Sequence, residues 1–190
     1  MAQKFDKKIF TFRLLCKDLG FLLYNFPEMV VAMKNKNISK AFMEKIMLIV
    51  TAVNGCSYCS WFHAKQAISS GIGDDEVKNM LKLQFDADTS DFEMIALLYA
   101  QHYAETNRKP EKEMTERLFE YYGMRTANHI ILFIRMIFFG NLLGNTYDAF
   151  LSRLKGNKAE DSNVCFETIF FIVNTPILLP MYPFTKKYRN

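Results

Sequence analysis

Apolar residues recur at spacings of three and four along most of this chain, which is the pattern of helices that bury one face. The pattern is most regular at Phe42, Ile46, Ile49, Val50 and Val53. Ser39 precedes this run and is a suitable N-cap, because its hydroxyl can accept a hydrogen bond from a free backbone N–H. Residues 46–53 alone would also fit a buried strand, but the periodic pattern starts before them and favours a helix.

Turn and capping residues divide the rest of the chain into further predicted helices. The expected helices span residues 5–23, 28–33, 56–70, 74–83, 92–104, 110–123 and 127–150, and the first of them could break near Gly20. Asn54 and Gly55 form the turn before residues 56–70, and Thr126 is the expected cap of residues 127–150. Residues 86–90 and 155–163 are polar and are expected to form loops.

The two most apolar segments lie in the last third of the chain. In residues 127–150, Arg135, Gly140 and Asn141 leave an uninterrupted apolar core that is too short for a membrane span. Residues 164–184 contain Glu167 and three prolines, which also disfavour spanning. We predict an all-α domain over residues 1–155, then a linker and an apolar C-terminal arm over residues 156–190. The arm is expected to pack on the core or on a neighbouring subunit, with contact to a membrane surface as the less favoured alternative.

Composition narrows the class of protein. The 190 residues are 50% apolar and 23% charged, which is typical of one globular domain. The 18 phenylalanines and 11 methionines indicate a thick helical core or a buried subunit interface. A scattered net charge of +4 argues against nucleic acid as a partner. The N-terminus has no apolar run of the signal-peptide type, so we expect a cytoplasmic protein, in which structural disulfides are rare.

Reactive residue types concentrate in residues 41–71. Cys56 and Cys59 are three positions apart and His63 follows four later, so a helix places all three on one face. A thiolate at Cys56 would be favoured by the helix N-terminus, and His63 could accept the proton of Cys59. Glu44, on the preceding helix, could return to the same level and orient the imidazole. Two thiols at this spacing can also close a disulfide, which permits a two-electron cycle.

Other interpretations of this stretch are less favoured. The same four side chains could bind zinc, but structural zinc sites usually use a second ligand pair, and neither Cys16 nor Cys165 has a partner nearby in sequence. Haem attachment requires a histidine directly after the second cysteine, which this sequence lacks. A thioredoxin-like fold would need strands around the pair, whereas both flanks have a helical pattern.

The spacing resembles a known family. Glu44, followed by G-C-x-Y-C-x-x-x-H-x-x-x-A from Gly55 and then Gly71, is similar to the AhpD-like alkylhydroperoxidase branch of the carboxymuconolactone decarboxylase superfamily. The resemblance implies an all-helical homo-oligomer with its active site near a subunit interface and with no cofactor or metal ion. It also implies a thiol peroxidase or disulfide reductase that an external dithiol resets.

The resemblance implies a role for each motif residue. Cys59, deprotonated through His63 with Glu44 behind it, attacks the peroxide, and Cys56 then closes the disulfide. Tyr58 stands where some active members have a second histidine, so a longer proton relay is not implied. Trp61 and Phe62 are bulkier than is common there, which would narrow the pocket or select an apolar substrate.

The remaining polar candidates are expected to be structural. We predict that His102 and His129 are core or interface groups and that Cys16 and Cys165 are packing residues. Asn141 and Asn145 need hydrogen-bond partners in a buried helix, and we expect them to hold a helix terminus rather than to face the active site. The alternative for the whole protein is a non-catalytic member of this fold that senses redox state, binds a partner or holds a metal ion.

Overall fold

The computed structural model describes residues 5–85, 89–160 and 162–188. Its elements are α1 (Phe12–Tyr24), α2 (Phe26–Ala32), α3 (Lys40–Asn54), α4 (Ser57–Ser69), α5 (Asp74–Met80), α6 (Asp91–Glu105), α7 (Lys112–Arg153), α8 (Val164–Leu178) and the 3₁₀ helix η1 (Tyr182–Tyr188). Within these residues there is no strand, and the one isolated bridge joins Phe5 to Ala159. The prediction of an all-α fold is confirmed.

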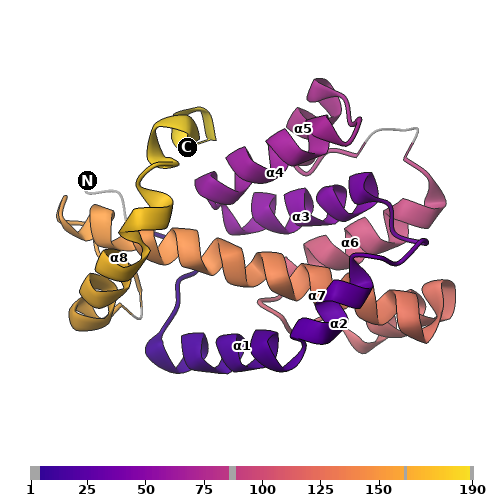
Figure 1. Cartoon of the computed structure of the whole chain (residues 1–190), viewed down its shortest axis with the longest axis horizontal. Helices are drawn as coiled ribbons and strands as arrows, with labels where there is room; N and C mark the ends of the chain where they lie inside the picture. Colours follow the sequence, from indigo (N-terminus) through magenta and orange to yellow (C-terminus); the bar gives the residue numbers. More distant parts are fainter. Residues whose placement is uncertain (1–4, 86–88, 161, 189–190) are drawn as a thin grey trace.

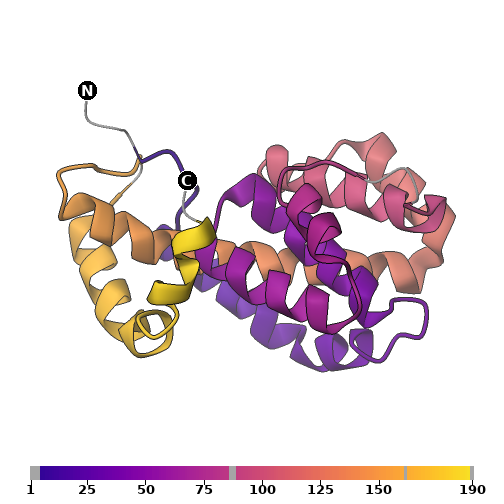
Figure 2. The ribbon, with the colours of Figure 1, turned by 90° about the horizontal axis from the view of Figure 1, so that it is seen from above.

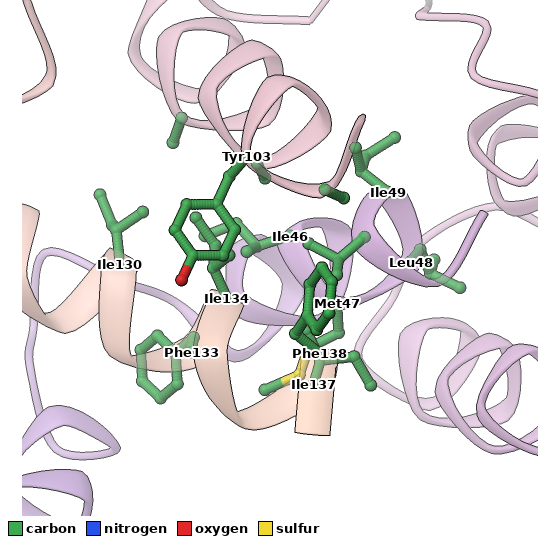
Figure 3. Packing of buried hydrophobic residues seen from close by; sticks show 14 of the residues in the cluster. Ile46, Met47, Leu48, Ile49, Tyr103, Ile130, Phe133, Ile134, Ile137 and Phe138 are labelled. Atoms are coloured by element: carbon green, nitrogen blue, oxygen red, sulfur yellow. The ribbon is translucent and has the colours of Figure 1, made fainter. Parts of the chain in front are cut away.

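The long helix α7 runs through the middle of the molecule, with α3 and α6 on one side and α1 and α2 on the other (Figure 1). Helix α4 packs on α3, while α8 forms one end of the molecule and η1 turns back to pack on α4 (Figure 2). The main core lies where α3, α6 and α7 meet. There Tyr103 reaches from α6 toward α7 and contacts Phe138 edge to face, with ring centroids 6.2 Å apart (Figure 3). The helix that carries Glu44 is therefore held from two sides by apolar packing.

Helix α3 confirms the helical interpretation of residues 46–53. Its N-cap is Ser39, whose hydroxyl accepts from the Phe42 N–H at 3.0 Å. Gly55 ends the helix with φ +66°, a left-handed conformation that costs glycine little. Because the turn is this short, α4 runs back along α3, and residues on the two helices face each other.

The start of the first helix and one expected cap differ from the sequence-based prediction. Helix α1 starts at Phe12 rather than near Phe5, because Thr11 caps it and Phe10 is buried in an extended segment instead. It continues through Gly20. The break expected between residues 110–123 and 127–150 is confirmed: within α7, Gly123 is not helical (φ +71°, ψ +163°), so the element consists of two helices joined at a kink. Thr126 is not a cap: its buried hydroxyl accepts from the Asn37 amide at 3.3 Å.

The C-terminal arm packs on the same chain. Arg153 at the end of α7 forms a 2.7 Å ion pair with the buried Glu167 of α8. The Phe171 ring stacks on Tyr147 of α7 with centroids 4.5 Å apart. Whether the arm also contacts a neighbouring subunit stays a prediction, as does the boundary at residue 155.

Two predictions about burial are wrong. Cys16 and Cys165, expected to be packing residues, are both exposed. Helical periodicity places a residue on a face but does not say which neighbour covers that face, and among the described residues none covers these two thiols.

By length and composition alone, α7 is long and apolar enough to cross a membrane. Helix α8 with η1 would count as a second, broken span bent by 95°. This is weak support for a membrane protein, because the core helix of a globular protein passes the same test. In α7, 61% of the apolar stretch is buried inside the molecule.

Candidate thiol redox site

Cys56 is the N-cap of α4 rather than a residue of its first turn. Its Sγ accepts a hydrogen bond from the Cys59 backbone N–H at 3.4 Å. A cap atom at this position lies against the free N–H groups and the positive end of the helix dipole, and both favour a thiolate. The local sequence therefore puts one cysteine where its charged form is stabilised by the backbone.

The two cysteines form a hydrogen-bonded pair with a closest approach of 3.2 Å. Burial would raise the pKa of the Cys56 thiol, but hydrogen bonds from the Cys59 thiol and backbone N–H bring it below its ordinary value. The pKa of Cys59 is held well above its ordinary value, first by the hydrogen bond to Cys56 and then by burial and the neighbouring charge. The pair thus loses its first proton readily and its second only at high pH, with the first charge centred on Cys56.

Glu44 and His63 are brought together, as their spacing suggested. His63 Nδ1 lies 2.7 Å from Glu44 Oε2, and both side chains are largely buried. A carboxylate can only accept, so Nδ1 carries the hydrogen and Nε2 is left as an acceptor. Among the described hydrogen bonds none joins His63 to either sulfur, so the imidazole does not contact the thiols directly in this arrangement.

Residues 22–101 match the model of the carboxymuconolactone decarboxylase family. The match spans less than half of the chain, from α1 into α6, and includes all four predicted site residues. It does not distinguish the AhpD-like branch, which stays a prediction. No curated protein and no solved structure matches the chain.

Helix α7, which lies beyond the matched residues 22–101, forms the wall behind the pair. A Cβ at Gly140 would lie 3.8 Å from Cys59 Sγ, whereas a Cβ at Gly144 would lie 2.5 Å from Cys56 Sγ. Gly144 is therefore required for the close approach of α7 to the buried sulfur. The only sign of this close approach in the sequence is that two glycines, Gly140 and Gly144, lie one helical turn apart.

Two asparagines of α7 have roles that sequence reasoning only half anticipated. Asn145 does hold a helix terminus, since its amide donates to the Asn54 carbonyl at the end of α3 at 2.8 Å. Asn141 instead faces the site, where its side chain hydrogen-bonds Cys59 and lowers that thiol's pKa against the larger opposing effects. It also donates to Thr51 at 3.0 Å and accepts from the Asn54 amide at 3.1 Å. Asn141 is thus a polar contact to the reactive pair that the family segment does not contain.

Aromatic residues close the other side of the pair. The Tyr58 hydroxyl donates to Asp148 at 3.1 Å. Tyr58, Tyr147 and Leu178 of α8 form a buried cluster with Cys56. Trp61 stacks on Phe184 of η1, with ring centroids 5.2 Å apart and an interplanar angle of 16°. The C-terminal arm therefore covers the pair.

The two remaining histidines lie outside the candidate site. His129 is buried between Asn35 and Glu28, at 2.9 and 2.8 Å, and holds α2 against α7. His102 accepts from the Glu111 backbone N–H at 3.1 Å and joins α6 to the start of α7. Both contacts are structural.

The zinc alternative lacks a ligand set. Among residues 5–85, 89–160 and 162–188, no three histidine, cysteine, aspartate or glutamate side chains lie close enough to share a metal ion. His63 and Glu44 bind each other, and the cysteines bind each other, so the four side chains form two pairs rather than one tetrahedral cluster.

Proposed function

We propose that this chain is an AhpD-like oxidoreductase that reduces peroxides or disulfides by cycling Cys56 and Cys59 between dithiol and disulfide. The family matched by residues 22–101 includes decarboxylases and AhpD peroxidases. The observation that carries the choice is the contacting pair of free cysteines at the start of α4. Such a pair serves redox chemistry directly and has no part in a lactone decarboxylation.

In the proposed cycle, His63 takes one proton from the dithiol, and Glu44 stabilises the resulting imidazolium. Cys59 is the attacking sulfur, because it is partly accessible whereas Cys56 is fully buried. Attack requires the remaining proton to move from Cys59 to Cys56, across the hydrogen bond that joins them. Asn141 stabilises the charge on Cys59 at that moment.

The bond changes balance for a hydroperoxide. The Cys59 thiolate attacks the terminal oxygen, the O–O bond breaks, and the alkoxide takes the proton held on His63 to leave as an alcohol. The Cys56 thiol then condenses with the Cys59 sulfenic acid, which releases water and forms the disulfide. An external dithiol reduces that disulfide by exchange and is itself oxidised. The scheme uses no cofactor and no metal ion.

We also propose where the protein works and how it assembles. A reducing compartment such as the cytoplasm would keep the pair in its dithiol form. We also propose a homo-oligomer with the site near a subunit interface, supported by the large apolar side chains that α1 and α8 expose, including Phe12, Leu23, Ile169 and Ile177.

The test is steady-state consumption of an organic hydroperoxide with dithiothreitol as reductant. Cys59→Ser and His63→Gln are expected to abolish turnover, while the exposed Cys16→Ser serves as the matched control and keeps it. General acid–base contributions are about 10²–10⁴-fold, so residual activity above about a tenth in His63→Gln contradicts the relay. A wild-type protein that oxidises once and does not turn over would instead be a redox sensor, the alternative favoured by the full burial of Cys56.

A further inference from the structure

A cavity of about 300 Å³ lies where five segments of the chain meet. Its walls come from the N-terminal segment, the end of α3, α4, α5 with its following turn, and η1. Four of the residues that line it are lysines, namely Lys7, Lys78, Lys82 and Lys187. These lysines are far apart in sequence, so their grouping comes from the tertiary fold.

The positive charge in this cavity, which we call the lysine pocket, is only partly balanced. Lys78 pairs with Asp74 at 2.5 Å and with Asp75 at 2.9 Å. Among the described residues no carboxylate forms an ion pair with Lys7, Lys82 or Lys187. Lysines that converge on a concave site with too few carboxylates attract an anion.

The lysine pocket is lined by the two residues that flank the cysteine pair in sequence. Gly55, directly before Cys56, and Ser60, directly after Cys59, both line it. The Ser60 hydroxyl donates to the Cys56 carbonyl at 3.0 Å. Lys7 lies across the turn that starts α4, with its Cε 3.6 Å from where a Gly55 Cβ would be, and its charge lowers the pKa of Cys56.

We propose that the lysine pocket binds the anionic end of a small substrate, a carboxylate or phosphate group, and so holds the peroxide or disulfide end at the cysteine pair. The volume suits a compact anionic group and excludes a polymer such as nucleic acid. The substrate role rests on the proposed redox function, whereas the binding of an anion does not.

The first experiment therefore measures binding alone. Inorganic phosphate and hexanoate are titrated calorimetrically into the wild-type protein and into the double variant Lys82→Gln/Lys187→Gln. The control, Lys34→Gln/Lys112→Gln, removes the same charge from exposed positions outside the pocket. Affinity for at least one probe is expected to fall about tenfold or more in the pocket variant and to change little in the control, because charge-assisted hydrogen bonds are lost. Absence of binding, or equal loss in both variants, overturns the proposal.

The second experiment tests the substrate role. A hydroperoxide that carries a carboxylate is compared with its neutral methyl ester. The wild-type protein is expected to show a higher kcat/KM for the acid, and the pocket variant to lose about tenfold of that preference while its kcat/KM for the ester is unchanged. Anion binding without a preference for the acid overturns the substrate role. If no hydroperoxide turns over, the redox proposal fails, and the titration still decides whether the pocket binds anions.

Discussion

Replacing Gly144 with alanine tests the closest contact in the proposed site. The new Cβ would lie 2.5 Å from Cys56 Sγ and 3.1 Å from Tyr58 Cδ2. Non-bonded heavy atoms pack at about 3.5–4.0 Å, so the sulfur must retreat by roughly 1 Å or α7 must move away. Either response disturbs the N-cap of α4, because the Cys56 sulfur accepts the hydrogen bond from the Cys59 N–H.

The structure sets the size of the effect. Overpacking a close-packed interior costs about 1–3 kcal/mol, and loss of an N-cap hydrogen bond costs about 0.5–2 kcal/mol. Alanine in place of a helical glycine gains about 0.5–1 kcal/mol through backbone entropy. Gly20→Ala isolates that gain, because nothing lies within 4 Å of a Cβ at this exposed position of α1. Relative to Gly20→Ala, Gly144→Ala is therefore expected to lose about 1.5–5 kcal/mol of unfolding free energy, the sum of the two costs.

Gly140→Ala is the second control, one helical turn away on the same face. Its Cβ would meet Cys59 Sγ at 3.8 Å, an ordinary contact, so its stability should match that of Gly20→Ala. Urea denaturation of the three variants gives the free energies, and pH-dependent alkylation should show a raised pKa for Cys56 in Gly144→Ala alone. The reasoning is refuted if Gly144→Ala is as stable as the two controls and its thiol titrates as in the wild type.

Three further predictions concern the pair and its cover. Asn141→Leu should lower the unfolding free energy by about 1–3 kcal/mol, since buried partners lose their hydrogen bonds, and should raise the pKa of Cys59 further. Phe184→Ala removes a stacked ring worth about 0.5–1.5 kcal/mol from Trp61, so alkylation of Cys59 should accelerate about two- to tenfold. Ultraviolet titration, in a variant without the two exposed cysteines, should show one thiolate below the ordinary thiol pKa and the second well above it, because the charge on Cys56 opposes ionisation of Cys59.

Each of these has a contrary result. If Asn141→Leu leaves the unfolding free energy and the thiol titration unchanged, the Asn141 amide does not contribute to the site. Unchanged alkylation in Phe184→Ala would mean that the arm does not limit access to the pair. Two thiolates that form together would contradict the hydrogen bond between the sulfurs.

Local sequence was enough to predict α3 and the turn after it. Ser39 caps the helix and Gly55 ends it because both act through their own neighbours in the chain. The pairing of Glu44 with His63 could also be anticipated, since a short turn between two helices sets which residues face each other. These features depend on spacing alone.

Features that depend on distant segments could not be predicted in the same way. Phe10 was predicted to be helical because a buried position selects an apolar residue whether its backbone is extended or helical. Cys16 lies on an uncovered face of α1, and periodicity does not say which face is covered. The contacts of Asn141 and Gly144 with the cysteines join residues more than eighty positions apart, and no local rule reports such a contact.

The arrangement of the arm has a consequence for how this protein could diversify. The groups that we propose to react all lie within residues 22–101, whereas Asn141, the Phe184 ring and Lys187 lie outside the matched segment. Substitutions in α8 and η1 can therefore alter which molecules reach the thiols without altering the thiols themselves. Related chains that keep the same chemistry would be free to differ most in their C-terminal thirds, and a comparison of those thirds should separate them by substrate.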